Sequence, residues 1–246
     1  MKKLVAYITS GYPEKSFSID LALALSQSGV DTLELGVPFS DPVADGPLIE
    51  LANQKALEFG FRFKDLIEIS KEIAPKVDTL WMGYFNSFYQ QNMQKLLPFA
   101  KEIGLSGFII PDLPHEESVV FNDLFNANAL SNISFVAPTD TNERIEQLVK
   151  DSKKFIYMVA YTGITGSGKA EDLQPILSNI KKHTQTPIYV GFGVNKKTAK
   201  DKVKGADGVI VGSAFVEILL DKTLSYTEKI DNCSELAKIL KGEINS

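Results

Sequence analysis

The chain has 246 residues, of which 44% are hydrophobic and 23% are charged, proportions that are typical of a folded globular protein. The formal net charge of -5 argues against a nucleic acid partner, because binding to a phosphate backbone calls for clustered lysines and arginines. The apolar run from Leu4 to Ile8 is too short for a signal peptide, and no apolar run reaches the length of a membrane span. A single cysteine, Cys233, fits a reducing compartment, so we expect a cytoplasmic protein.

Short apolar runs alternate with helical patterns along the whole chain. We expect strands at residues 4–9, 32–35, 79–82, 107–110, 133–137, 155–160, 187–190 and 208–211. A helical pattern follows each of them, which predicts an α/β protein with a closed (β/α)₈ TIM barrel, formed by residues 1–246 as a single domain. An open doubly wound sheet is the alternative, but it would usually carry a GxGxxG loop after the first strand, where this sequence reads TSGYPE.

Two carboxylates between the second strand and the helix that follows are the first candidates for chemistry. Glu34 falls in an apolar strand, where burial disfavours the charged form of a carboxyl group and raises its pKa. Asp45 follows in the loop, close to Pro47. In a barrel, the loops that follow the strands build the active site. The alternatives are an ion pair with a lysine for Glu34 and a helix cap for Asp45.

Three glycine-bearing loops follow the last three expected strands, at residues 161–168, 191–194 and 212–214. Barrels commonly bind phosphate at these loops through backbone N–H groups and a helix N-terminus. Only two basic residues are arginines, which favours backbone amides over an arginine fork. We therefore predict Gly193, Gly212 and Ser213 as phosphate ligands, with tight turns as the other explanation for the glycines. Residues 162–172 form a long polar loop whose composition suits a lid as well as an ordinary loop.

Four further polar residues are candidates for the site. Tyr157, on the sixth expected strand, fits the barrel core as well as the site. Asp112 follows the fourth strand, where a turn or cap role is the alternative. The two histidines, His115 and His183, lie at the start and the end of helical patterns, so a histidine-based triad or metal cluster is not expected.

Six stretches resemble the tryptophan synthase alpha chain family. LELGVPFSDPVADGP, at residues 33–47, resembles the family's signature stretch. The resemblance continues in order through GFIIPDLPHEES, VAPT, YMVAYTGITG, VGFGV and ADGVIVGSA, and covers nearly the whole chain. Two departures stand out. Family members usually begin with an extra helix before the first strand, and the third loop reads MGYFN where the family more often has Met-Thr/Ser-Tyr-x-Asn.

The resemblance implies a lyase that cleaves indole-3-glycerol phosphate to indole and glyceraldehyde 3-phosphate in a retro-aldol reaction. It implies that Glu34 is the principal acid-base group, that Asp45 binds the indole N–H, and that Tyr157 orients the glutamate. The other substrate contacts implied by the resemblance are Thr165 in the closing loop, Gly166, Gly193, Gly212 and Ser213 at the phosphate, and Met82, Ile109 and Phe192 around the indole.

The family works as an α2β2 complex whose beta chain carries pyridoxal phosphate and joins indole to serine to form L-tryptophan. We therefore expect no cofactor and no metal in this chain. We expect contacts with the beta chain through the loops after strands two and six, with Pro38, Phe39 and Pro42 exposed. Three alternatives stay open: an isomerase or synthase of different chemistry on the same barrel, a barrel that only activates a partner, and a freestanding lyase.

Overall fold

The strands in the described part of the chain are all parallel and belong to one sheet with the order β5-β4-β3-β2-β1-β9-β8-β7-β6. The computed structural model describes residues 1–159 and 173–246. The strands in this part of the chain are β1 (Lys3–Thr9), β2 (Thr32–Gly36), β3 (Thr79–Met82), β4 (Gly107–Ile109), β5 (Ser131–Asn132), β6 (Ser134–Val136), β7 (Ile156–Val159), β8 (Ile188–Gly191) and β9 (Gly208–Val211).

The sheet closes into a barrel because its two end strands, β5 and β6, belong to one continuous stretch of chain that pairs with a different neighbour on each side. β5 pairs with β4 and β6 pairs with β7, and only Ile133 lies between them. The N–H of Ile133 donates to the carbonyl oxygen of Phe108 at 2.9 Å, which continues the pairing with β4. The predicted barrel is therefore confirmed. The fifth expected strand, residues 133–137, corresponds to β6, and β5 directly precedes it and pairs with the other neighbour, β4.

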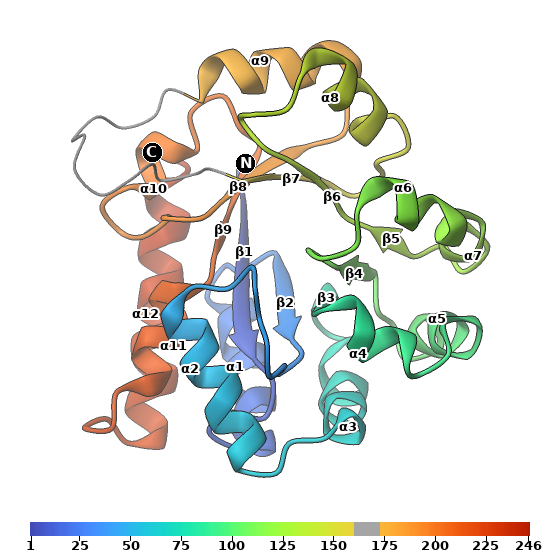
Figure 1. The fold of residues 1–246 in the computed structure, drawn as a ribbon. Helices are drawn as coiled ribbons and strands as arrows, with labels where there is room; N and C mark the ends of the chain where they lie inside the picture. The colour runs from blue at the N-terminus through green and yellow to red at the C-terminus, as the bar shows by residue number, and fades with distance from the viewer. Residues whose placement is uncertain (160–172) are drawn as a thin grey trace.

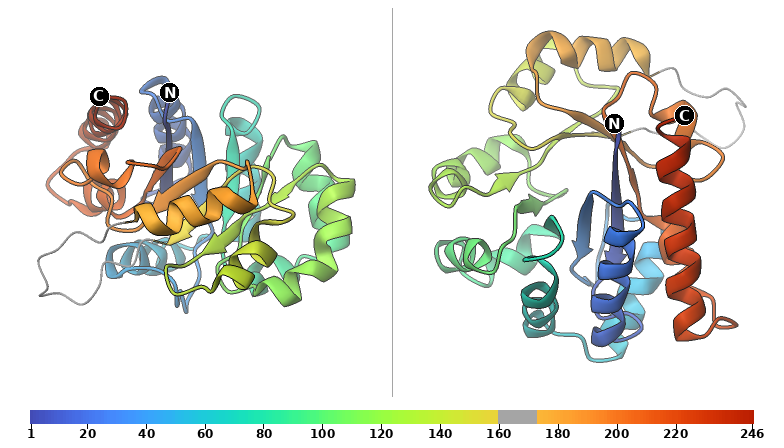
Figure 2. Two further views of the ribbon diagram at one scale, coloured as in Figure 1. Left: turned by 90° about the horizontal axis from the view of Figure 1, so that it is seen from above. Right: turned by 180° about the vertical axis from the view of Figure 1, so that it is seen from behind.

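Helices surround the sheet on the outside, as Figures 1 and 2 show. They are α1 (Lys15–Gln27), α2 (Pro47–Glu58), α3 (Phe63–Ile73), α4 (Phe85–Tyr89), α5 (Met93–Glu102), α6 (His115–Ser118), α7 (Asn122–Ala127), α8 (Asn142–Val149), α9 (Gln174–His183), α10 (Ala199–Lys202), α11 (Ser213–Leu220) and α12 (Tyr226–Glu243), with a 3₁₀ turn, η1, at Val119–Phe121. Cys233 is fully buried on α12, as expected for a small apolar residue in a helix that packs on the core.

The inside of the barrel is filled by side chains from alternate strand positions, as the two-residue period of a strand requires. The apolar cluster inside the ring of strands consists of Val5, Leu80, Met82, Ile109, Ile133, Phe135, Phe155, Tyr157, Tyr189 and Ile210. Glycines on neighbouring strands make room for its aromatic rings and for Tyr7. A Cβ atom at Gly36 would overlap the ring of Tyr7, and one at Gly191 would overlap that of Tyr157.

Ion pairs lie at the end of the barrel where the strands begin. Asp31 and Asp78 each directly precede a strand and bind lysines from distant parts of the chain. Asp31 pairs with Lys3 at 3.0 Å and with Lys241 of α12, and Asp78 pairs with Lys154 at 2.8 Å. Asp31 and Asp78 thus form structural ion pairs at this end of the barrel, and the candidate site lies at the opposite end.

We predict that Gly36→Ala destabilises the protein by about 1–3 kcal/mol, because the added methyl group overpacks the space that Tyr7 fills. Gly242→Ala is the matched control, since nothing lies within 4 Å of a Cβ atom there and the residue is exposed in α12. It should stabilise the helix by about 0.5–1 kcal/mol. Urea denaturation measures both. An equal cost of Gly36→Ala in a Tyr7→Leu background would exclude ring overlap as the cause.

Candidate active site

Glu34 is a buried carboxyl group inside the barrel. It lies in the middle of β2, beside Tyr7 of β1 and Leu80 of β3, and is 2% exposed. Its Oε1 atom has no hydrogen-bond partner in the described part of the chain, and none of the ion pairs found there includes Glu34. Burial, together with the charge of Asp45, raises the pKa of Glu34 to about 8. The structural ion pair considered as an alternative does not exist among these residues.

Asp45 lies in the loop between β2 and α2, where its N–H donates to the carbonyl oxygen of Pro42 at 3.1 Å. Its Oδ2 atom accepts a hydrogen bond from Nδ2 of Asn53 at 3.2 Å. The N-cap of α2 is Gly46, with Pro47 as the first helical residue, so the helix-cap interpretation of Asp45 is wrong. Burial raises the pKa of Asp45 to about 6, and hydrogen bonds from Tyr84 and Asn53 oppose that rise.

Tyr84, in the loop after β3, ties the Asp45 loop to the rest of the site. Its Oη atom accepts the N–H of Ala44 at 2.9 Å, which leaves the phenol proton to donate to Asp45. The ring of Phe39 stacks on that of Tyr84 with centroids 5.1 Å apart. Burial and the charge of Asp45 raise the pKa of Tyr84. The phenol therefore stays neutral and remains a donor.

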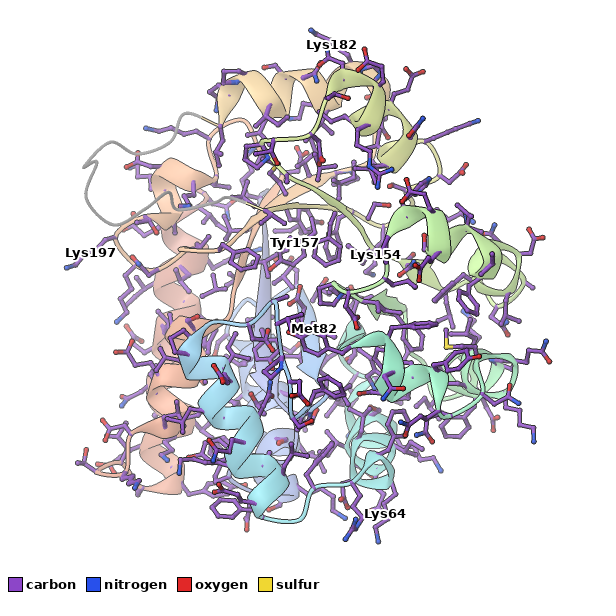
Figure 3. The ribbon with its side chains drawn as sticks, in the orientation of Figure 1. Lys64, Met82, Lys154, Tyr157, Lys182 and Lys197 are labelled. Atoms are coloured by element: carbon purple, nitrogen blue, oxygen red, sulfur yellow. The ribbon has the colours of Figure 1, made fainter. Side chains whose placement is uncertain are left out.

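Tyr157 projects into the middle of the ring of strands, as does Met82 from β3 (Figure 3). The Tyr157 ring stacks on Phe135 with centroids 5.0 Å apart, and burial and then the charges of Glu34 and Asp45 raise its pKa well above the ordinary value. Tyr7 is also buried, and the same two charges contribute to the raised pKa of its phenol. Neutral phenols thus surround the carboxyl pair.

The two described glycine loops lie side by side, because they follow the paired strands β8 and β9. Gly193 has a φ of +65°, and its carbonyl oxygen accepts a hydrogen bond from Oγ1 of Thr198 at 2.7 Å. Gly212 is the N-cap of α11, which begins at Ser213 and has no side-chain cap, so its first amide groups are open to an anion. The tight-turn explanation fits the left-handed Gly193, whereas Gly212 has a φ of -117° and needs no glycine for its backbone conformation.

The three residues expected around an indole ring come from both sides of the barrel. Ile109 is buried on β4 and pairs in register with Met82 of β3. Phe192, just after β8, is 43% exposed and packs edge-on against Tyr157 with centroids 6.2 Å apart. Its φ of +70° is unusual for a residue with a side chain, and such strain is often found at functional sites. Thr165 and Gly166 lie outside the described residues.

The loop after β2 differs from its expected exposure. Pro38 is buried and Phe39 is half-buried under Tyr84, so neither is the exposed contact that was predicted. Pro42 is half-buried, whereas Val43 is 86% exposed. The difference arises because the first half of the loop packs down on the barrel mouth, which leaves the tip as the exposed part.

Asp112 is a structural residue, which was the alternative considered for it. Its Oδ1 atom accepts the N–H of Phe85 at 2.7 Å, at the first residue of α4.

Among the described residues, no group of three or more His, Cys, Asp or Glu could hold a metal ion. None of the helices described is both long and apolar enough to cross a membrane.

The family model for the tryptophan synthase alpha chain matches residues 1–245. The chain belongs to the tryptophan synthase alpha chain family. A tryptophan synthase alpha chain from Wolinella succinogenes is 55% identical over 100% of this chain and 97% of its own length. Tryptophan synthase subunit alpha from Campylobacter jejuni has a TM-score of 0.86 at 34% identity, with 96% of this chain and 95% of that chain covered. A ligand-free tryptophan synthase structure from M. tuberculosis has a TM-score of 0.88 at 30% identity, with 100% and 94% covered.

Tryptophan synthase alpha chains are TIM-barrel lyases of tryptophan biosynthesis that cleave indole-3-glycerol phosphate. Membership excludes the first alternative, a barrel enzyme of different chemistry. Three residues of the site were not predicted as such: Tyr7, Asn53 and Tyr84. The MGYFN motif that departs from the family's usual pattern contains Tyr84, and an asparagine in the apolar stripe of α2 was the signal for Asn53.

The unusual ionisation of Glu34 predicts that stability falls as the pH rises. The folded state keeps a proton up to about pH 8, whereas the unfolded chain releases it near the ordinary value of 4.5, so unfolding releases a proton between these values. The contribution of Glu34 is fully present below pH 4.5 and is lost as the pH rises to about 8; its shift corresponds to an upper limit of roughly 5 kcal/mol. Urea denaturation from pH 5 to 9 should show this decrease in the wild type and a much smaller one in Glu34→Gln. A parallel decrease in both proteins would contradict the prediction, and Glu102→Gln, at an exposed position, is the control.

Proposed function

We propose that Glu34 and Asp45 divide the acid-base work of the family's lyase reaction in this chain. The observation that carries the proposal is the contrast between the two carboxyl groups. Glu34 is buried without a hydrogen bond to Oε1, so it is mostly protonated at neutral pH and serves as the acid. Asp45 accepts hydrogen bonds from Asn53 and Tyr84, so it is mostly ionised and serves as the anion.

Cleavage begins with transfer of the Glu34 proton to C3 of the indole ring, which gives a positively charged indolenine. The bond between C3 and the glycerol chain then breaks, and its electron pair returns to the ring. The adjacent hydroxyl group of the glycerol chain loses its proton to the Glu34 carboxylate and becomes the carbonyl group of glyceraldehyde 3-phosphate. Asp45, hydrogen-bonded to the indole N–H, stabilises the cation, which develops only after protonation.

The other site residues are proposed as substrate contacts. The charge of Glu34 contributes to the raised pKa of Tyr157, so the two side chains lie close together. Tyr157 is therefore proposed to orient the Glu34 side chain. Met82, Ile109 and Phe192 would form the apolar walls for the indole ring. The residues proposed to bind the phosphate are Gly166, Gly193, Gly212 and Ser213. Thr165 is proposed to contact Asp45. Thr165 and Gly166 belong to the part of the chain that the structure does not describe.

We predict that Glu34→Gln and Asp45→Asn each reduce the rate of indole release from indole-3-glycerol phosphate by about 10² to 10⁴, because each substitution removes one half of the acid and anion pair. Both variants should remain folded, since the amides keep the shape of the acids, and circular dichroism checks this. Indole release at the wild-type rate from folded Glu34→Gln would exclude Glu34 as the acid. Glu102→Gln is again the surface control.

The proposal includes a tryptophan synthase beta chain as partner, in an α2β2 complex. Tryptophan synthase structures from M. tuberculosis resemble this chain over nearly its whole length, one of them in an aminoacrylate-bound form. We propose that the pyridoxal phosphate of the reaction belongs to the beta chain, that this chain itself holds no cofactor, and that both act in the cytoplasm. The exposed tip of the loop after β2, at Val43, is the proposed contact.

We predict that the beta chain speeds indole release by the wild-type chain and that Val43→Asp weakens this effect, because a charge would be buried in the contact. Ala127→Asp, at an exposed position where α7 leads back to the other end of the barrel, adds the same charge and should leave association unchanged. Titration with the beta chain, followed by indole release, measures both. Fast release without the beta chain would identify a freestanding lyase, and ligand binding without release a barrel that only activates a partner.

A further inference from the structure

A buried asparagine, Asn53, donates a hydrogen bond to the Asp45 carboxylate. Asn53 lies on the inner face of α2 between the buried Ala52 and Ala56 and is 1% exposed. Its Nδ2 atom donates to Oδ2 of Asp45 at 3.2 Å, across eight residues of chain. Its Oδ1 atom has no hydrogen-bond partner among the described residues.

The missing partner of Oδ1 is the unusual feature of this side chain. A buried polar atom without a hydrogen bond costs a protein about 1–3 kcal/mol, and an apolar side chain of the same size would avoid that cost. The neighbouring buried positions of α2 are alanines, so packing alone gives no reason for an amide here. The contact with Asp45 gives one, because a carboxylate only accepts hydrogen bonds and the amide nitrogen supplies a donor.

We propose that Asn53 is a positioning residue for the lyase reaction, which fixes the Asp45 carboxylate in place and keeps it in the anionic form that the indole N–H requires. This inference rests on the proposed role of Asp45. Asn53 itself acts through Asp45 and need not touch the substrate.

The charges around Asp45 explain why a donor is needed. The titratable groups that face the pair are Glu34 from β2, Glu50 from α2, Tyr7 from β1, Tyr84 from the loop after β3, and Tyr157 from β7. Negative charge on Glu50 and burial both disfavour the Asp45 anion. Asn53 and Tyr84 work in the opposite direction, each with one hydrogen bond.

The test compares Asn53→Leu, which removes the donor and keeps the branched shape of the side chain, with Gln54→Leu, which removes an amide donor at the next, exposed residue of α2. Loss of one charge-assisted hydrogen bond should move the acidic limb of the kcat/KM profile for indole release, which reports the free enzyme, upward by about one pH unit. With the Asp45 pKa at about 6 in the ligand-free wild type, kcat/KM should fall about fivefold at pH 6 and by less than twofold at pH 7.5. Gln54→Leu should follow the wild type throughout.

A purely structural role for Asn53 would give a different profile. In that case Asn53→Leu would lower kcat/KM by the same factor at every pH and leave the limb in place, and this result would overturn the proposal. Asn53→Ala, which removes the donor without adding bulk, replaces Asn53→Leu should the leucine variant not fold.

A measurement without turnover separates this inference from the proposed function. The ¹³Cγ resonance of Asp45 in the ligand-free chain reports its titration directly, and the apparent pKa should rise by about one unit in the Asn53 variants. An unchanged titration overturns the role of Asn53 even in an enzyme that releases indole. A raised pKa in a chain that releases no indole supports the contact and counts against the lyase assignment alone.

Discussion

The site depends on one carboxyl group that the barrel encloses without a full set of partners. Glu34 faces the inside of the ring of strands, where the other filling is apolar or phenolic, and one of its oxygens has no hydrogen bond among the described residues. A charge there would be costly, so the group stays protonated well above the ordinary pKa of a glutamate. The barrel can tolerate this because its stability comes from elsewhere: the parallel strand pairing, the apolar clusters under the helices, and the ion pairs of Asp31 and Asp78 at the opposite end.

Glu34 and Asp45 have similar intrinsic acidity, but their surroundings in the folded chain give them different pKa values. Asp45 lies in a loop and accepts hydrogen bonds from Asn53 of α2 and from Tyr84 of the loop after β3, whereas Glu34 lies in a strand and has only the barrel interior around it. Strand and loop therefore place the two carboxyl groups in different electrostatic surroundings although they are only eleven positions apart. Burial raises the pKa values of Tyr7 and Tyr157 well above the ordinary value, so these phenols stay neutral near pH 7 and add hydrogen-bonding capacity without adding charge.

Sequence patterns were sufficient for everything that depends on local periodicity or on a continuous motif. The eight strand and helix units, the buried acid in the second strand and the two turns after the last strands were all predicted in place. Patterns failed where the decisive partner is distant in sequence. Nothing near Pro38 indicates that the loop folds onto Tyr84, and nothing near residue 133 indicates that one expected strand pairs in two directions. Tyr84 was missed for the same reason, because its contact with Asp45 joins two loops that are distant in sequence. Asn53 lies on the helix directly after the Asp45 loop, and its signal was local, an asparagine within the apolar stripe of α2.

The unsatisfied atoms give a physical reason why the substrate should fit this mouth of the barrel. The three buried side-chain atoms without partners in the described part of the chain are the Ser10 hydroxyl, Oε1 of Glu34 and Oδ1 of Asn53, and all three residues lie on β2, on the loop after β1 or on the helix that follows β2. A protein under no functional constraint would replace such groups, since each lowers its stability. Their concentration around one pair of strands means that the folded chain is least complete where Glu34 and Asp45 meet. A ligand that donates a hydrogen bond to Oε1 of Glu34 would satisfy one of these atoms, so binding of the proposed substrate would regain part of the stability given up in the free protein.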